Sequence, residues 1–334
     1  MKYVSGQILT KNGFIKGYLG FEKDTIFEVG KGLPIKKPLC KGLIVPSFIN
    51  AHTHIGDSFI KKRKINLPKN VIDLVKPPDG LKHKLLKEVK EKEIVEGMKD
   101  SIKIMYKCGI KKFCDFREGG LKGVFELNMA LKNELLSAII FSRPSELKYN
   151  SDEIEILLKN SNGIGLSSIS DWDFSEIKKI SSHVKKRKKL FAIHASEIFR
   201  ENIDDILQLK PDFLIHMIKA TESDLICIKD YNIPIILCLR SNYYYGLNPN
   251  IKLMRKVGVK FMFGTDNSML YTPNIIDEIK FVKNKYKEFS MNELLYIITY
   301  EARKALNLNC DILGANSKAD FVVLDKKTLK PLYV

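Results

Sequence analysis

The stretch Ile44-Val-Pro-Ser-Phe-Ile-Asn-Ala-His-Thr-His54 closes an apolar segment with two histidines. Residues two apart in a strand point to the same side, so His52 and His54 can both reach one metal ion. This segment is the first of eight short apolar runs, at 43–51, 112–116, 137–141, 163–168, 190–194, 212–216, 233–239 and 260–263. Most segments between them carry helical patterns, and this alternation predicts a parallel sheet. Eight such units over roughly 250 residues are typical of a (β/α)8 barrel.

Short strands separated by turns are predicted on both sides of this repeating region. They cover 3–9, 14–21 and 25–29, and a further one covers 319–324. The pattern marks a barrel over 43–306, with segments of short strands at 1–42 and 307–334 on either side of it. Within the barrel, 56–90 is a long polar insertion, and insertions of that length are often functional.

The chain has 334 residues, with 56 Lys and Arg against 39 Asp and Glu, and a formal net charge of +17. With 45% hydrophobic residues it is not a disordered chain. The basic excess raises nucleic acid, an anionic membrane or an anionic substrate as partners. We find no RNA-binding motif and no apolar run long enough for a signal peptide or a membrane span. The six cysteines contain no CxxC pair, as in reduced proteins. We therefore expect a cytoplasmic protein that binds neither nucleic acid nor a membrane.

Four of the six histidines, namely His52, His54, His194 and His216, fall at the carboxyl ends of predicted strands. Asp266 ends the eighth strand. Active sites of these barrels lie at that end. Three imidazoles and one carboxylate suit Zn²⁺, with Fe²⁺ and Mn²⁺ as alternatives. Each histidine alone could be an ordinary buried polar residue, but the joint pattern favours a metal site.

At these residues the sequence resembles the amidohydrolase superfamily of metal-dependent hydrolases. The matching stretches are 44–54, Ile193-His-Ala-Ser-Glu197, Leu214-Ile-His216 and Phe263-Gly-Thr-Asp-Asn267. The resemblance implies a TIM-like (β/α)8 barrel of the α/β class, with a small β-sandwich domain built from both termini. It also implies that His52, His54, His194 and Asp266 bind the metal.

Within this superfamily, the pattern resembles the branch of cytosine-, guanine- and adenosine-type deaminases. Glu197 follows His194 in an HxxE motif, and 163–170 contains no lysine to bridge a second metal. The resemblance implies one divalent metal, most simply Zn²⁺. Hydroxide generated at the metal would attack an amino-substituted heterocycle and release ammonia. Asp266 would act as ligand and base, His216 would orient the hydroxide or polarise the leaving group, and Glu197 would shuttle protons.

Two other functions stay open from the sequence. An amidase, cyclic-amide hydrolase or chlorohydrolase of the same superfamily would use the same metal and the same attacking hydroxide. A non-catalytic scaffold or RNA-binding relative would use the basic surface instead. A homodimer is a candidate assembly only because dimers are the commonest homo-oligomers.

Only eight residues are arginine, and several of them follow predicted strands. Arg117, Arg143 and Arg240 come after strands two, three and seven. A guanidinium binds carboxylate or phosphate with two parallel bonds, so we hypothesise a small anionic substrate. The alternative is that the arginines pair with neighbouring carboxylates and brace the barrel. Asn242, in a segment similar to a family motif, and Asp57, soon after His54, are further candidates for substrate contact.

Overall fold

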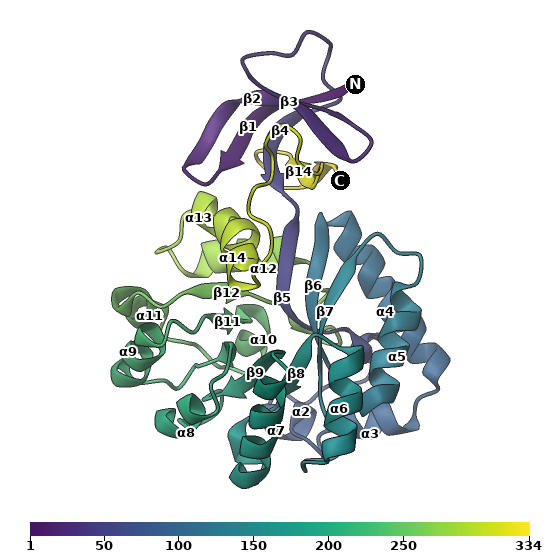
Figure 1. Ribbon diagram of the computed structural model, residues 1–334, viewed down its shortest axis with the longest axis vertical. Helices are drawn as coiled ribbons and strands as arrows, with labels where there is room; N and C mark the ends of the chain where they lie inside the picture. The colour runs from purple at the N-terminus through teal and green to yellow at the C-terminus, as the bar shows by residue number, and fades with distance from the viewer.

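The computed structural model describes residues 1–334 and confirms the predicted barrel (Figure 1). Eight parallel strand positions surround its axis, and the strands are β5 (Phe48–His54), β6 (Ile110–Arg117), β7 (Ser137–Ser142), β8 (Gly163–Leu166), β9 (Leu190–Ala195), β10 (Phe213–His216), β11 (Ile235–Leu237) and β12 (Phe261–Phe263). A short continuation of the eighth strand, β13 (Asp266–Asn267), pairs with β5 and closes the sheet.

Helices cover the outside of the barrel (Figure 1). The main ones are α4 (Glu91–Lys107), α5 (Gly120–Leu131), α6 (Ser151–Asn160), α7 (Phe174–Lys186), α8 (Ile203–Gln208), α9 (Glu222–Asp230), α10 (Leu239–Tyr244), α11 (Ile251–Val257) and α12 (Ile275–Lys285). The last helical segment consists of α13 (Met291–Tyr296), a π-helical turn (Ile297–Glu301) and α14 (Ala302–Ala305). No helix combines the length and apolar character that crossing a bilayer requires.

The polar insertion at 56–90 folds into short helices over the carboxyl end of the barrel. They are a 3-10 turn (Ile55–Asp57), α1 (Ser58–Lys62), α2 (Val71–Val75) and α3 (Leu81–Glu88). Asn70 begins α2, because its side chain accepts a hydrogen bond from the backbone N–H of Asp73 at 2.8 Å. The insertion therefore has defined structure and lies where it can shape a site.

Strand residues alternate between two apolar clusters, as a closed barrel requires. The inner cluster fills the barrel and includes Ile49, Ala51, Phe116, Phe141 and Ile215. The much larger outer cluster packs the other faces of the strands against the helices. Near its end, β5 shifts register against β6 between Asn50 and Thr53. Such irregularities re-aim side chains, and here the His52 ring lies against Phe116 of the inner cluster, with 4.2 Å between ring centroids.

The two ends of the chain form one six-stranded sheet in the order β15-β14-β4-β1-β2-β3. Its strands are β1 (Lys2–Thr10), β2 (Gly13–Glu22), β3 (Thr25–Lys31), β4 (Lys41–Pro46), β14 (Phe321–Leu324) and β15 (Pro331–Tyr333). The apolar run expected as a single strand at 43–51 is divided at Ser47. Its first part, β4, lies in this sheet and its second part, β5, in the barrel. Figure 1 shows the sheet standing at the end of the barrel where β5 begins.

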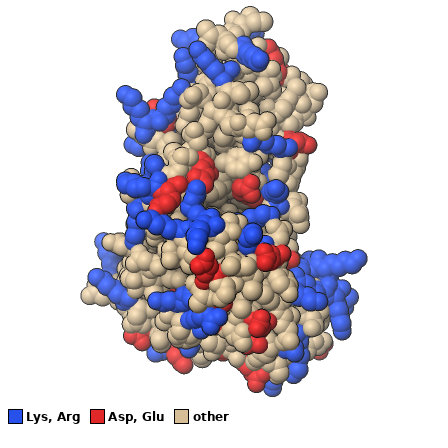
Figure 2. Space-filling model, turned by 90° about the vertical axis from the view of Figure 1, so that its left-hand side faces the viewer, with Lys and Arg blue, Asp and Glu red and all other residues tan.

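Charged side chains are distributed over the surface without segregation by sign. On the face shown in Figure 2, Lys and Arg side chains are spread widely, with Asp and Glu among them. Many lysines pair with nearby acids, such as Lys62 with Asp100 and Lys256 with Glu222. Exposed pairs of this kind contribute little to stability.

Arg303 of α14 ties the terminal sheet to the barrel. Its buried guanidinium donates hydrogen bonds to the Ser47 carbonyl at 2.7 Å, the Ser47 hydroxyl at 2.9 Å and the Asp320 carboxylate at 2.9 Å. Ser47 separates the two sheets, and Asp320 immediately precedes β14. The Arg303 side chain therefore contacts both segments through which the chain passes between the barrel and the terminal sheet.

We predict that Arg303→Met lowers the free energy of unfolding by about 2–4 kcal/mol, because it leaves buried acceptors without donors. Arg187→Met is the matched control, since Arg187 pairs with Glu155 at 2.8 Å but is 56% exposed. The control should lose about 0–1 kcal/mol. Urea unfolding of both variants measures the difference, and equal losses would contradict the assigned role.

Candidate functional site

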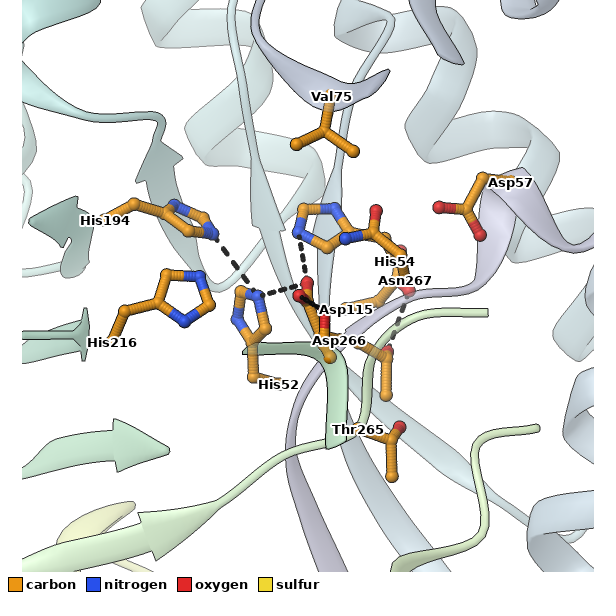
Figure 3. Close-up of polar contacts among 12 residues, drawn as sticks. His52, His54, Asp57, Val75, Asp115, His194, His216, Thr265, Asp266 and Asn267 are labelled. Atoms are coloured by element: carbon orange, nitrogen blue, oxygen red, sulfur yellow. Dashed lines mark hydrogen bonds and ion pairs between the residues drawn. The ribbon is translucent and has the colours of Figure 1, made fainter. Parts of the chain in front are cut away.

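Three histidines and one aspartate converge inside the barrel mouth (Figure 3). Ring nitrogens of His52, His54 and His194 all lie within 4.8 Å of one another. The Nε2 atom of His52 is 3.3 Å from that of His194. Asp266 Oδ1 lies 3.4 Å from His52 Nε2 and 3.6 Å from His54 Nε2. The predicted donors are therefore brought to one point by β5, β9 and β13.

Backbone conformation at the strand ends contributes to this convergence. Asp266 and His216 have positive φ angles of 58° and 75°. Residues without glycine's freedom rarely adopt such angles, and they concentrate at functional sites. Hydrogen bonds hold the Asp266 turn, since the Ser241 hydroxyl donates to Asp266 Oδ2 at 2.5 Å and the Thr265 N–H donates to the His52 carbonyl at 2.9 Å.

The histidines are held in the neutral form that binds metals. Burial and neighbouring histidines place the pKa of His194 well below its ordinary value, and burial together with Lys82 lowers the pKa of His54 to about 4. Burial opposes the charged form of Asp266, but contact with His52 and the other histidines outweighs it and keeps the pKa of Asp266 well below its usual range. The carboxylate is therefore ionised.

Contacts behind the rings direct their lone pairs toward the common point. His194 Nδ1 lies 2.7 Å from the Leu166 carbonyl, and His54 Nδ1 lies 2.9 Å from Glu118 Oε1. A proton on each Nδ1 leaves Nε2 as an acceptor, which is the arrangement that orients metal-binding histidines. Three neutral imidazoles and one carboxylate fit a divalent metal of the Zn²⁺ type.

Glu197 and His216 form the side of the site opposite His54. His216 Nε2 lies 3.5 Å from Glu197 Oε1. The Asn242 amide is 3.1 Å from His216 Nδ1 and donates to Glu197 Oε1 at 3.4 Å. No lysine or arginine pairs with Glu197. Burial and the nearby Asp266 therefore raise the pKa of Glu197 well above its usual value, which favours the acid form of this carboxyl group.

A cavity of about 80 Å³ opens in front of these groups. Its walls include His54, His194, His216, Glu197 and Asp266 from the barrel. The insertion supplies the opposite wall through Val71, Val75, Lys76 and Pro77. Asn242 does not line the cavity but is buried behind it, where it holds two groups that do.

Four arginines lie at or after the ends of barrel strands, namely the three predicted ones and Arg200. They differ in the groups that their side chains contact. Arg117 is buried and contacts Asp115 and Glu118, with the closest approach 2.6 Å to Glu118. Arg200 makes two 2.8 Å hydrogen bonds to Asp224. Arg240 lies 4.4 Å from the centre of the Tyr271 ring and 4.0 Å from Glu278. The bracing alternative describes these three, which lie outside the cavity; among the four, Arg143 alone lines it.

Asp57, expected to contact substrate, is fully buried behind the cavity. It accepts a hydrogen bond from the Met269 N–H at 2.9 Å and lies 3.4 Å from the Lys82 ammonium. Burial raises the pKa of Asp57 to about 7. The structure therefore places Asp57 beneath the site and in contact with the insertion.

Glu118 was predicted only as a carboxylate partner for the arginines, and Lys82 was not singled out from the sequence. Lys82 of α3 is 2% exposed, with its ammonium 2.6 Å from Glu118 and 2.9 Å from the Asn267 side chain. Through Glu118 the insertion reaches His54. The presence of an acid directly after β6 could have indicated Glu118, but nothing local to residue 82 indicates burial.

Comparison with known proteins identifies the family. The model of the Amidohydrolase family matches residues 43–334, so the chain belongs to the amidohydrolase family of hydrolases. An uncharacterized protein of Methanocaldococcus jannaschii is 36% identical, with 97% of this chain and 86% of that protein covered. A protein of Archaeoglobus fulgidus named "Putative aminohydrolase" is 30% identical, with 84% of this chain and 79% of that protein covered.

A solved structure shows the same fold. The crystal structure of an adenosine deaminase from Xanthomonas campestris with bound zinc superposes with a TM-score of 0.76. The match covers 98% of this chain and 85% of that chain at 14% sequence identity. This likeness shows the fold, and the histidine cluster that could hold a metal ion lies at the mouth of the barrel.

We predict that His52→Ala and His54→Ala abolish stoichiometric metal binding, because each removes a donor from a set of four. His183→Ala is the control, since His183 lies on α7, outside the metal-binding cluster, beside Glu155. Elemental analysis of the purified variants after dialysis gives the metal content. Full occupancy in either donor variant would contradict the assignment.

We also predict that Lys82→Met destabilises the fold by about 3–5 kcal/mol, because it leaves buried acids without their cation. The control is Lys185→Met, whose partner Asp212 is equally close at 2.8 Å but whose side chain is 32% exposed. That variant should lose about 0–1 kcal/mol. Similar urea midpoints for the two variants would show that Lys82 does not anchor the insertion.

Proposed function

We propose that the protein is a mononuclear metal-dependent aminohydrolase that deaminates an amino-substituted heterocycle. The observation that carries this proposal is the carboxyl group of Glu197. It lies on the cavity wall beside the metal-binding cluster, has no lysine or arginine partner, and has a pKa that burial raises well above the usual value. Deamination of a heterocycle needs an acid at this place, to protonate the ring nitrogen next to the carbon that is attacked.

In this proposal His52, His54, His194 and Asp266 hold one ion, most simply Zn²⁺. A metal in that position supplies Lewis acidity, which lowers the pKa of water to about 7. A second ion lacks a bridging group, because β8 ends in Leu166 and the next residues are serines. Support for a single ion therefore comes from the chemistry of the residues present.

The residues of this chain divide the proton transfers between them. The Asp266 carboxylate is ionised and accepts a proton from the attacking water. The oxygen of that water bonds to the ring carbon that carries the amino group, while Glu197 gives its proton to the adjacent ring nitrogen. His216, neutral because burial lowers its pKa to about 4, orients the attacking group. Asp266 then returns its proton to the amino group, Glu197 takes back a proton from the added hydroxyl, and cleavage of the carbon–nitrogen bond releases ammonia.

The relatives support the same reaction class. The Archaeoglobus protein is named as an aminohydrolase, and the zinc-containing structural neighbour is an adenosine deaminase. An amidase would use the same donors without a ring nitrogen to protonate, whereas a chlorohydrolase that acts on a heterocycle would use the same acid and differ only in its leaving group. Ammonia released from a purine, pterin and pyrimidine panel supports deamination, whereas chloride or a ring-opened acid as product would support the alternative.

We predict that Glu197→Gln lowers turnover by roughly 100-fold or more with metal content unchanged. Glu134→Gln, at a partly exposed position outside the cavity and without an ion-pair partner, is the control. Because the acid form of Glu197 is required, the activity of the parent enzyme should fall as pH rises through the raised pKa of this group. Glu197→Gln should lose that alkaline limb. Near-normal turnover, or an unchanged alkaline limb, would contradict the proposed role.

A further inference from the structure

Arg143 is the arginine that lines the metal-site cavity. Its guanidinium makes no hydrogen bond to any protein group, and its nearest carboxylate is Glu118 at 4.0 Å. Yet its side chain is only 12% exposed. Burial without a hydrogen-bonded carboxylate lowers the pKa of this guanidinium below its ordinary value. A buried arginine usually has a bidentate partner, so the missing acceptor is informative.

Glu118 does not fill this role, because three closer donors already contact its oxygens and Arg143 stays 4.0 Å away. The Lys82 ammonium and the Arg117 guanidinium both approach it at 2.6 Å, and His54 Nδ1 lies at 2.9 Å. A carboxylate offers about four acceptor positions. Arg143 is thus the third and most distant cation around one acid, with free N–H groups directed at open space.

The open space is the junction of two cavities. Arg143, Glu118 and Pro77 line both the metal-site cavity and a larger neighbouring cavity of about 490 Å³. The second cavity lies between α3, the start of α5 and the segment after β7. Lys87 and Lys122 add positive charge to its walls, and His83 is neutral there because burial lowers its pKa to about 3. Glu126 pairs with Lys122 at 3.8 Å, and Glu146 is exposed.

We infer that the substrate is an amino heterocycle with an anionic arm, whose phosphate or carboxylate group binds Arg143 at the junction of the two cavities. The ring occupies the metal-site cavity, where Glu197 meets it, and the arm extends into the second cavity toward Lys87 and Lys122. This inference rests on the proposed deaminase function for the ring, but the anion site itself does not depend on turnover.

The first test measures anion binding without catalysis. Metal-loaded protein is titrated by calorimetry with inorganic phosphate and with succinate, and a Kd on the order of 1 mM for at least one of them is expected. Arg143→Met should weaken that binding at least about tenfold, and Arg143→Lys should weaken it less, because lysine keeps the charge but loses the planar fork. The preferred anion identifies the group on the arm.

Two controls make this test specific. Arg187→Met removes an exposed arginine elsewhere and should leave anion binding unchanged. Lys87→Gln with Lys122→Gln should reduce affinity about threefold or more, whereas Lys36→Gln with Lys37→Gln, on the terminal sheet, should not. Binding that is absent in the parent protein, or that persists at full strength in Arg143→Met, would overturn the inference; persistent binding would belong to the metal.

The second test measures ammonia release from matched heterocycles with and without a phosphate or carboxylate arm. We expect the anionic member of a pair to be favoured by about 100-fold in kcat/KM, and Arg143→Met to remove most of this preference. Ammonia release that favours the neutral member would overturn the inference and leave the deaminase proposal standing. If anion binding depends on Arg143 but no heterocycle releases ammonia, the deaminase proposal is overturned and the anion site remains.

Discussion

The site depends on the convergence of three imidazoles and one carboxylate at the mouth of the barrel. Their acceptor atoms lie 3.3–3.6 Å apart, while the Nδ1 atoms of His54 and His194 face acceptors behind them. Acceptors that face one another in a buried space are unfavourable without a cation between them. A divalent metal satisfies all four at once. The positive φ of Asp266 and the register shift of β5 are the local distortions that bring the donors together.

Beneath this cluster lies a second layer of buried charge, in which acids and cations alternate. Asp57, Lys82, Glu118, Arg117 and Asp115 follow one another in space, with each neighbouring pair within 3.4 Å. The layer fixes His54 through Glu118 and attaches the insertion through Lys82. It therefore joins the roof of the cavity to the metal donors, and it leaves Arg143 as the cation without an acid of its own.

The barrel and the donor set could be predicted from the sequence because both depend on local pattern. Apolar runs mark the strands, and the HxH spacing places two rings on one side. Sequence pattern alone did not show which arginines pair with carboxylates and which line the cavity. Phe116 points into the barrel, so alternation turns Arg117 toward the helices and toward Asp115, two residues away; this signal was available. Whether Arg143 has a carboxylate partner, in contrast, depends on Glu118. Glu118 contacts Lys82, which lies 36 positions earlier in the chain. Packing of an insertion over such a distance leaves no trace in local spacing.

The single-metal centre is the central claim of this account, and anomalous diffraction from crystals of the metal-loaded protein tests it most directly. Data collected at the zinc absorption edge should show one peak per chain, about 2.0–2.2 Å from a nitrogen of each of His52, His54 and His194 and from a carboxylate oxygen of Asp266. Two peaks at the barrel mouth, or one peak that leaves any of these four donors unbound, would contradict the account.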